Sequence, residues 1–261
     1  MNLELKDVIH NHKSIREYED CEISQELLDE ILEAGIRASS SGNMQTYSIV
    51  VTKDKALREK LYEAHMEQSM VVDAPVLVTF CADFNRMRKW LVLNDAPVHF
   101  DNFMSLMIGA IDATLASQNC ALAAENRGLG ICYMGSTLAN CDQIGELLNL
   151  PENVVPIVGF SLGYPAENPA PRDRLPLEGI VHYEQYQDYS DADILKIYEE
   201  RNENGWNRYM AIPRLKEMVE ELGVKNLAQV YTMAKYTKES HTAFSQKVLS
   251  YLEKQNFMNN D

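Results

Sequence analysis

The segment RASSSGNMQTYSIVVT, residues 37–52, joins two different periodic patterns. Apolar residues recur at helical spacing before it, and β-branched residues cluster at its end. Between them lie four consecutive serine or glycine residues, Ser39 to Gly42. Their backbone N–H groups and small hydroxyls suit an oxygen-rich ligand, because nothing bulky prevents its approach. The same composition is typical of an ordinary turn, so the segment alone leaves both interpretations open.

Outward from this segment, the periodicity predicts secondary structure along most of the chain. Helices are expected at residues 3–12, 24–38, 55–66, 103–127 and 142–150, and strands at residues 47–52, 76–81 and 154–162. Residues 131–136 are expected to form a further short strand that runs into a turn of small residues. The first two strands are apolar enough to be buried on both faces. Residues 85–101 follow no period and are expected to be irregular. From about residue 186 the pattern is helical and charged, which predicts a core at residues 1–185 and a helical extension of the same domain at residues 186–261.

The helix expected at residues 103–127 is nearly uncharged and apolar almost all round. A helix of this kind is buried and needs contacts on every side. A partner subunit would help to provide them.

Composition restricts the possible partners. The chain has 261 residues and a net charge of −15, with 39 acidic against 24 basic residues. This balance argues against nucleic-acid and anionic-membrane partners, which require clustered Lys and Arg. No apolar run approaches the ~20 residues of a membrane span, and the first residues do not resemble a secretory signal. The five cysteines form no Cys-x-x-Cys pair, so no metal site is expected and the cytoplasm is the expected location.

Two basic clusters are candidate phosphate sites. His12, Lys13, Ser14 and Arg16 lie within five residues. If this segment is extended, Ser14 and Arg16 point to one side and Ile15 to the other, into the core. Arg172 and Arg174 lie on a Pro-rich loop after the last expected strand, where they could reach a phosphate. Solvated surface groups are the simpler alternative for both clusters.

Two further positions are ambiguous. Gly135 lies in a second turn of small residues, where its backbone N–H can approach a planar ligand closely. A glycine at the end of a strand is equally common without a ligand. Gln68, taken by itself, is most simply a surface residue.

Five motifs, in this order, resemble the flavin-dependent nitroreductase family. They are His12-Lys13-Ser14-x-Arg16, the loop Ser39-Ser40-Ser41-Gly42-Asn43-Met44-Gln45, Gly130-x-x-Tyr133-Met134-Gly135, Gly163-Tyr164-Pro165 and Arg172-x-Arg174. Within the family, the chain looks most like the NADPH-dependent flavin reductases and oxygen-insensitive nitroreductases. The subgroup usually has Lys where Arg172 stands and an aromatic residue where Asn43 stands.

The resemblance implies an α+β, nitroreductase-like fold, with a central sheet flanked by helices, in an intertwined homodimer. Each of two FMN sites would be built from both chains. One chain would supply the phosphate and ribityl side, the polar edge of the isoalloxazine and its ring face, and the other chain would supply the Ser-rich loop. The implied FMN-binding residues are His12, Lys13, Ser14, Arg16, Gln68, Tyr133, Met134, Gly135, Ser136, Arg172 and Arg174 of one chain, and Ser39, Ser40, Ser41 and Asn43 of the other.

The function implied is an FMN-dependent NAD(P)H oxidoreductase that reduces nitroaromatics, quinones or flavins. Hydride would pass from NADPH or NADH to flavin N5, and a small-molecule acceptor would then take the place of the nicotinamide, which implies ping-pong kinetics. The flavin carries the redox chemistry, so no catalytic residue is expected. A storage or sensing protein that binds FMN without turnover and a specialised flavin enzyme, such as a reductive dehalogenase, are the alternatives.

Overall fold

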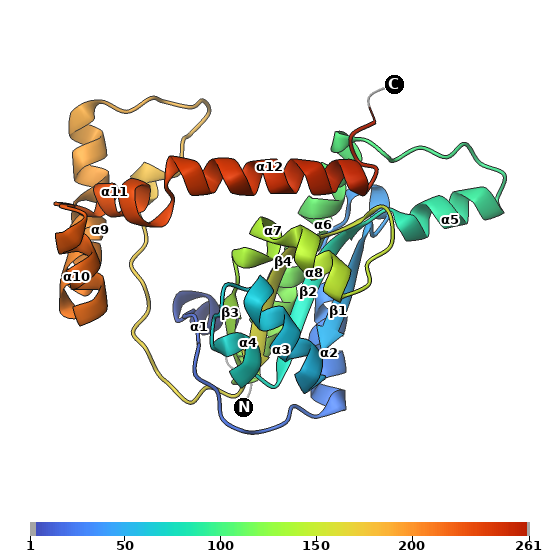
Figure 1. The fold of residues 1–261 in the computed structure, drawn as a ribbon, viewed down its shortest axis with the longest axis horizontal. Coiled ribbons are helices and arrows are strands. Elements are labelled where there is room, and N and C mark those ends of the chain that lie inside the picture. The colour runs from blue at the N-terminus through green and yellow to red at the C-terminus, as the bar shows by residue number, and fades with distance from the viewer. Residues whose placement is uncertain (1–3, 260–261) are drawn as a thin grey trace. The chain divides into compact units, whose positions relative to one another are not determined.

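The computed structural model describes residues 4–259 of the chain. Leu3, at the start of the first predicted helix, lies outside the described residues. The chain forms two compact units. The first runs to Ala170 and resumes at Phe244, and the second is Pro171–Ala243. Figure 1 labels the helices and strands of both.

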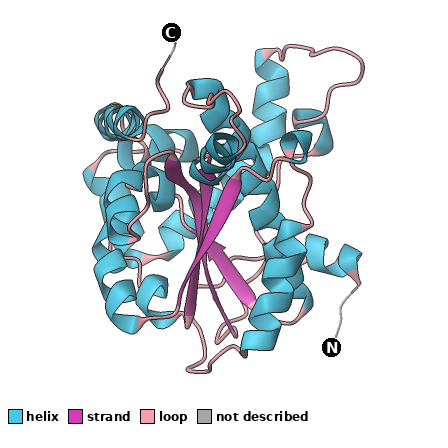
Figure 2. Cartoon of the chain, turned by 90° about the vertical axis from the view of Figure 1, so that its right-hand side faces the viewer, coloured by secondary structure: helices cyan, strands magenta, loops and turns pink. Residues whose placement is uncertain are grey.

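The first unit contains an antiparallel sheet, drawn in magenta in Figure 2. Its strands in chain order are β1 (Tyr47–Thr52), β2 (Val76–Asp83), β3 (Gly130–Tyr133) and β4 (Val154–Gly163), and their spatial order is β1-β2-β4-β3. Each neighbouring pair is antiparallel. Together with the surrounding helices, this sheet confirms the α+β prediction.

Two helices cover one face of the sheet. They are α2 (Gln25–Ile36) and α6 (Phe103–Asn126). Helix α6 packs on the strands and on α2, and Leu28 and Ile31 of α2 join the same core. Val76, Val78 and Phe80 alternate along β2, so all three face this layer and join its core. The predicted ends of α6 are correct to within one residue, because Asn102 caps its start and Gly128 follows its end.

The intervening residues of β2 face a second helical layer. Leu77 packs there with Leu61, Met70 and Ile144. The helices of this layer are α3 (Lys55–Ala64), α4 (Met70–Asp73), α7 (Ser136–Ala139) and α8 (Cys141–Leu147). β2 is therefore buried on both faces, as predicted.

Two predictions about local structure were wrong. Strand β1 is only partly buried between its ends, because it lies at the edge of the sheet with a single neighbouring strand. Residues 85–101 are not irregular throughout, since α5 (Asn85–Leu93) occupies the first part. None of its residues is buried, so α5 has no apolar face whose period the sequence could reveal.

The remaining elements are α1 (Leu5–His10), the 3-10 helix η1 (Ser41–Asn43) and the helices of the second unit. The second unit contains η2 (Leu177–Gly179), α9 (Asp191–Ala211), α10 (Pro213–Glu221), α11 (Leu227–Gln229) and the π-helical η3 (Val230–Lys235). Tyr209, Val219 and Leu227 form part of its own core. Helix α12 (Lys238–Lys254) begins in this unit and ends in the first. Helices suited to crossing a membrane are absent from residues 4–259.

Candidate functional site

The basic segment at residues 12–16 lies alongside strand β3. The backbone N–H of Ile15 donates to the carbonyl of Ile131 over 2.9 Å, and Ser14 pairs with Ile131 in a parallel bridge. Ile15 is 2% exposed, whereas Arg16 is exposed. Burial raises the pKa of the Cys132 thiol, and the charge of Arg16 and a hydrogen bond with the Ser14 side chain partly oppose this rise. The predicted alternation, with Ile15 in the core and the polar residues on the other side, is confirmed.

The side chains of His12 and Lys13 and the backbone of Arg16 have polar partners. His12 Nδ1 lies 2.6 Å from Glu125 Oε1, at the end of α6. Because a carboxylate accepts, Nδ1–H donates there and Nε2 is left for another partner. Lys13 Nζ donates to Asn168 Oδ1, and the backbone N–H of Arg16 donates to Glu167 Oε1 over 2.5 Å. A cavity of about 610 Å³ lies beside this segment, lined in part by His12, Lys13, Glu125, Gly128, Glu167 and Asn168.

The segment after β3 carries the second predicted group. Burial raises the pKa of Tyr133 to about 12, and its hydroxyl donates to Ser117 Oγ on α6 over 3.1 Å. Met134 is buried and Gly135 is exposed. A Cβ built at Gly135 would meet nothing within 4 Å, so a flat molecule has room to lie against the backbone there.

Gln68 reaches this segment from the turn after α3. Its Nε2 donates to the carbonyl of His65 over 2.8 Å and to Ser136 Oγ over 3.1 Å. His65 Nδ1 lies 2.9 Å from the same Ser136 oxygen. Burial lowers the pKa of His65 to about 4, so its ring is neutral at pH 7. The sequence analysis missed His65, which nothing local distinguishes from a surface histidine.

These groups follow one line along β3. Ile131 lies beside Ser14, β3 ends at Tyr133, and the chain then turns at Gly135 into α7. We call Ser14, Arg16, Gln68 and Tyr133 to Ser136 the β3 half-site. The structure therefore brings together predicted residues from three separate segments of the sequence.

The Ser-rich loop is anchored on a different part of α6. Asp112, fully buried, accepts from the hydroxyls of Ser40 over 2.7 Å and Ser41 over 3.2 Å, from the Ser41 backbone N–H over 3.0 Å and from Thr46 Oγ1 over 3.3 Å. The Ser40 hydroxyl also accepts from the backbone N–H of Gln45. Both serines have thus already donated their hydroxyl protons within the chain, whereas Ser39 is exposed.

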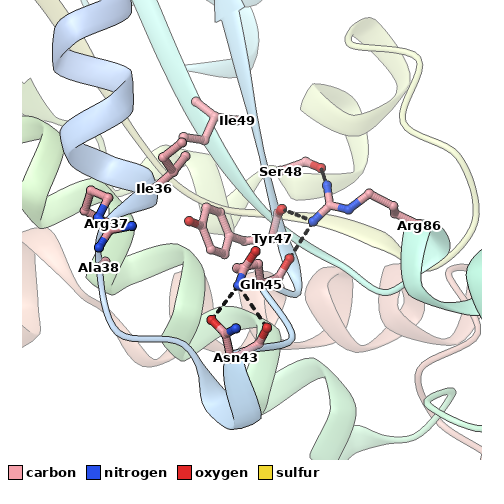
Figure 3. A pocket seen from close by; sticks show the side chains of 9 residues that line it. All are labelled: Ile36, Arg37, Ala38, Asn43, Gln45, Tyr47, Ser48, Ile49 and Arg86. Atoms are coloured by element: carbon pink, nitrogen blue, oxygen red, sulfur yellow. Dashed lines mark hydrogen bonds between the residues drawn. The ribbon is translucent and has the colours of Figure 1, made fainter.

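A tight backbone completes this loop. Gly42, Asn43 and Gln45 have φ values of 56°, 56° and 50°. Gln45 Nε2 donates to Asn43 Oδ1 over 2.6 Å. Arg86, which the sequence analysis did not single out, donates to the carbonyl of Tyr47 over 3.1 Å and to Ser48 Oγ over 3.2 Å. Figure 3 shows these bonds around a cavity of about 650 Å³.

Within one chain, the loop and the basic segment do not meet at one ligand. Their anchors on α6, Asp112 and Glu125, are separated by about three and a half turns, or ~20 Å. Their cavities share no lining residue. Arg172 and Arg174 lie in the second unit, where Arg174 donates to the carbonyls of Arg172 and Asp173, each over 3.1 Å. Their part in the site stays a prediction.

The chain is similar in sequence to named proteins and in fold to solved structures. An FMN reductase [NAD(P)H] from Bacillus subtilis (strain 168) is 36% identical over 82% of this chain and 95% of its own length. An oxygen-insensitive NADPH nitroreductase from Salmonella typhimurium (strain LT2) is 37% identical over 75% of this chain and 79% of its own. A solved structure of an oxidoreductase from Bacteroides fragilis NCTC 9343 has a TM-score of 0.89, is 42% identical, and matches 97% of this chain and 100% of its own.

The family model points the same way. The model described as the nitroreductase family matches residues 9–164. This range contains the basic segment, the Ser-rich loop, Gln68 and the segment after β3. The chain belongs to the nitroreductase family.

Proposed function

We propose that the protein is a homodimeric, FMN-dependent NAD(P)H oxidoreductase that reduces nitroaromatics, quinones or flavins. The names of its relatives support this assignment: one is a flavin reductase and another an NADPH nitroreductase. A cytoplasmic location remains our expectation from the sequence.

The β3 half-site is the observation that carries the proposal. The polar groups of the half-site follow the same order as the parts of FMN. At one end, the hydroxyl of Ser14 and the guanidinium of Arg16 suit the phosphate. At the other end, Gly135 leaves the backbone open for a planar ring, and the Oε1 atom of Gln68 has no hydrogen-bond partner within residues 4–259. The residues present therefore fit this cofactor.

When bound, FMN supplies the redox chemistry by accepting hydride from a nicotinamide and passing electrons to the acceptor. The chain's own residues hold and orient it. Ser14 and Arg16 bind the phosphate, and each hydrogen bond to this charged group contributes about 1.5–3 kcal/mol. In a protein with a net charge of −15, such local cations are necessary, and we expect Arg172 and Arg174 to join them. Tyr133, whose raised pKa keeps its hydroxyl protonated, packs against Phe160 and keeps β3 in place.

A second copy of the chain would complete the site. Met104, Met107, Ile111 and Leu115 recur at helical spacing on α6 and are 40–66% exposed. An exposed apolar stripe of this length indicates an interface. Since the Ser-rich loop lies ~20 Å along α6 from the basic segment, we assign Ser39, Ser40, Ser41 and Asn43 to the FMN site of the partner.

The electron donor and the order of reaction are parts of the same proposal. One binding face shared by nicotinamide and acceptor gives ping-pong kinetics, seen as parallel lines in double-reciprocal plots. We favour NADPH, with its 2′-phosphate bound by arginines of α9 and α10. Arg201 is already paired with Asp173 over 3.0 Å and with Tyr231 over 3.0 Å, which leaves Arg208 and Arg214 as the first candidates. Comparing kcat/KM for the two nicotinamides, in the wild type and in Arg208→Ala, tests this preference.

The activity has a direct test. The purified protein should be yellow and should oxidise NADPH when a nitroaromatic is added. A colourless protein that does not bind added FMN contradicts the proposal. A storage or sensing protein would bind FMN but keep its visible absorption unbleached when either nicotinamide is added without oxygen.

A further inference from the structure

The orientation of the Gln68 amide is fixed by its partners. Nε2 lies 2.8 Å from the backbone carbonyl of His65. A carbonyl oxygen only accepts, so the amide nitrogen, and not Oε1, must face it. Oε1 therefore points to the other side of the amide, where it has no partner within residues 4–259. Gln68 offers an acceptor there.

The hydrogen bonds at Ser136 extend this argument to His65. Ser136 Oγ is 3.1 Å from Gln68 Nε2 and 2.9 Å from His65 Nδ1. Gln68 donates, so the single hydroxyl proton of Ser136 is free to go to Nδ1. If Nδ1 carried a proton, the hydroxyl of Ser136, which is 5% exposed, would lose that acceptor. The arrangement that gives the Ser136 hydroxyl proton an acceptor is Gln68 to Ser136 to His65, with the His65 proton on Nε2.

The neutrality of His65 agrees with this arrangement. The ring is 1% exposed, and burial lowers its pKa to about 4. At neutral pH, Nδ1 is therefore available as an acceptor.

The backbone next to Gln68 is also constrained, by two residues in a left-handed conformation and by hydrogen bonds at the end of α3. Met66 and Glu67 have φ values of 58° and 54°, a left-handed conformation that costs free energy for residues with a Cβ. Asn140 Nδ2 donates to the carbonyl of Ala64 over 2.7 Å, and Lys247 Nζ donates to Asn140 Oδ1 over 2.8 Å. These contacts fix the end of α3, from which the turn departs.

We infer that His65 is a positioning residue which, through Ser136, locks the amide of Gln68 so that the half-site presents a hydrogen-bond acceptor to its ligand. The inference rests on the proposed function. The matching ligand group is an N–H on the polar edge of the isoalloxazine, and the imide N3–H of oxidised flavin has this chemistry. His65 does not touch the ligand and acts only through Ser136 and Gln68.

The proton positions can be measured without any ligand. Long-range ¹H–¹⁵N spectra of the ¹⁵N-labelled protein at pH 7 distinguish a protonated from an unprotonated ring nitrogen. We expect His65 Nδ1 to be unprotonated and Nε2 to carry the proton. A proton on Nδ1 would overturn the inference, whatever the variants do.

Ligand discrimination tests the consequence. The probes are FMN and 3-methyl-FMN, which carries a methyl group in place of the N3 proton, and the measurement is the Kd by quenching of flavin fluorescence. We expect the wild type to prefer FMN about tenfold, the value of one hydrogen bond of 1.4 kcal/mol. The preference should fall below about threefold in His65→Leu and in Ser136→Ala. His65→Asn, whose Oδ1 can accept in place of Nδ1, should retain more of it than His65→Leu.

Ser105→Ala is the matched control, because Ser105 is also buried (3% exposed) on α6 and its hydroxyl donates to Asn102 Oδ1 over 3.0 Å. Ser105→Ala should prefer FMN over 3-methyl-FMN as strongly as the wild type does. If this control loses as much of the preference as His65→Leu and Ser136→Ala, the inference is overturned. A wild type that binds FMN, with a preference unchanged in both His65→Leu and Ser136→Ala, overturns the inference but not the proposed function. A wild type that does not bind FMN overturns both.

Discussion

The Ser-rich loop and the β3 half-site use their polar groups in opposite ways. In the loop, the hydroxyls of Ser40 and Ser41 donate inward to the buried carboxylate of Asp112. In the half-site, the Oε1 atom of Gln68 lacks a partner within residues 4–259 and the backbone at Gly135 is open. The hydroxyls of Ser40 and Ser41 are thus satisfied within the chain, whereas the half-site keeps an acceptor and an open stretch of backbone that, in our proposal, a ligand would use. In the proposed dimer, this loop would form one preformed side of the partner's FMN site.

The largest expected effect comes from removing the anchor of the loop. Asp112→Ala leaves four donor groups without their acceptor in a buried site, so the free energy of unfolding should fall by about 4 kcal/mol. Chemical denaturation measures this loss. Asp112→Asn, which keeps one acceptor oxygen, should lose about half as much. A loss below 1 kcal/mol for both would show that the loop does not depend on Asp112.

Acidification should weaken the half-site through His65. The pKa of His65 in the folded protein, about 4, lies below its ordinary value of 6.5. As the pH falls, His65 therefore binds a proton in the unfolded chain before it does so in the folded protein. The stabilising contribution is complete above about pH 6.5 and is lost as the pH falls to about 4, by about 3 kcal/mol in all. Between pH 7 and pH 4, the free energy of unfolding should fall more steeply with decreasing pH in the wild type than in His65→Leu. Identical slopes would contradict a neutral, buried His65.

Arg16→Ala should separate ligand binding from folding. Arg16 is exposed, and its side chain is assigned to the phosphate. FMN affinity should fall by about 2 kcal/mol, or roughly thirtyfold, with little change in Tm. Arg88→Ala is the control, since Arg88 pairs with Asp101 over 3.6 Å and lies outside the half-site. If both variants bind FMN equally well, Arg16 is not a phosphate ligand.

The smallest effect concerns the strained turn. Glu67→Gly removes a Cβ from a left-handed residue, and the relief should raise the free energy of unfolding by about 0.5 kcal/mol. FMN should bind slightly more weakly, because the turn that carries Gln68 becomes less rigid. Asn149→Gly, at a φ of 53° outside the half-site, should gain less stability, since Asn tolerates this conformation better, and should leave FMN binding unchanged.

Local patterns predicted much of the fold, because the elements in question bury a periodic face. Helix α6 was located to within one residue, and Ile15 was assigned correctly to the core. Helix α5 was missed because it buries no residue, and the exposure of β1 was missed because an edge position depends on strand order. Periodicity cannot report either property.

The site was predictable only in part, for a different reason. The residues proposed to face the ligand form short motifs, whereas the residues that support them are single and distant in sequence. Asp112 interrupts an apolar helix, and this was a usable signal, because a buried acid requires donors. Glu125 and His65 gave no such signal, since their partners, His12 and Ser136, are joined to them only by the folded chain.

Subunit complementation tests most directly whether the two regions belong to one site built from two chains. One variant is Arg16→Glu, which damages the half-site, and the other is Ser39→Asp, which places a negative charge on the exposed loop. Each alone should bind FMN poorly. If the two variants are coexpressed and assort randomly, the account predicts that about a quarter of the sites combine an intact half-site with an intact loop and regain wild-type affinity. No recovery in a verified heterodimer would contradict it, because both regions would then act within the same chain.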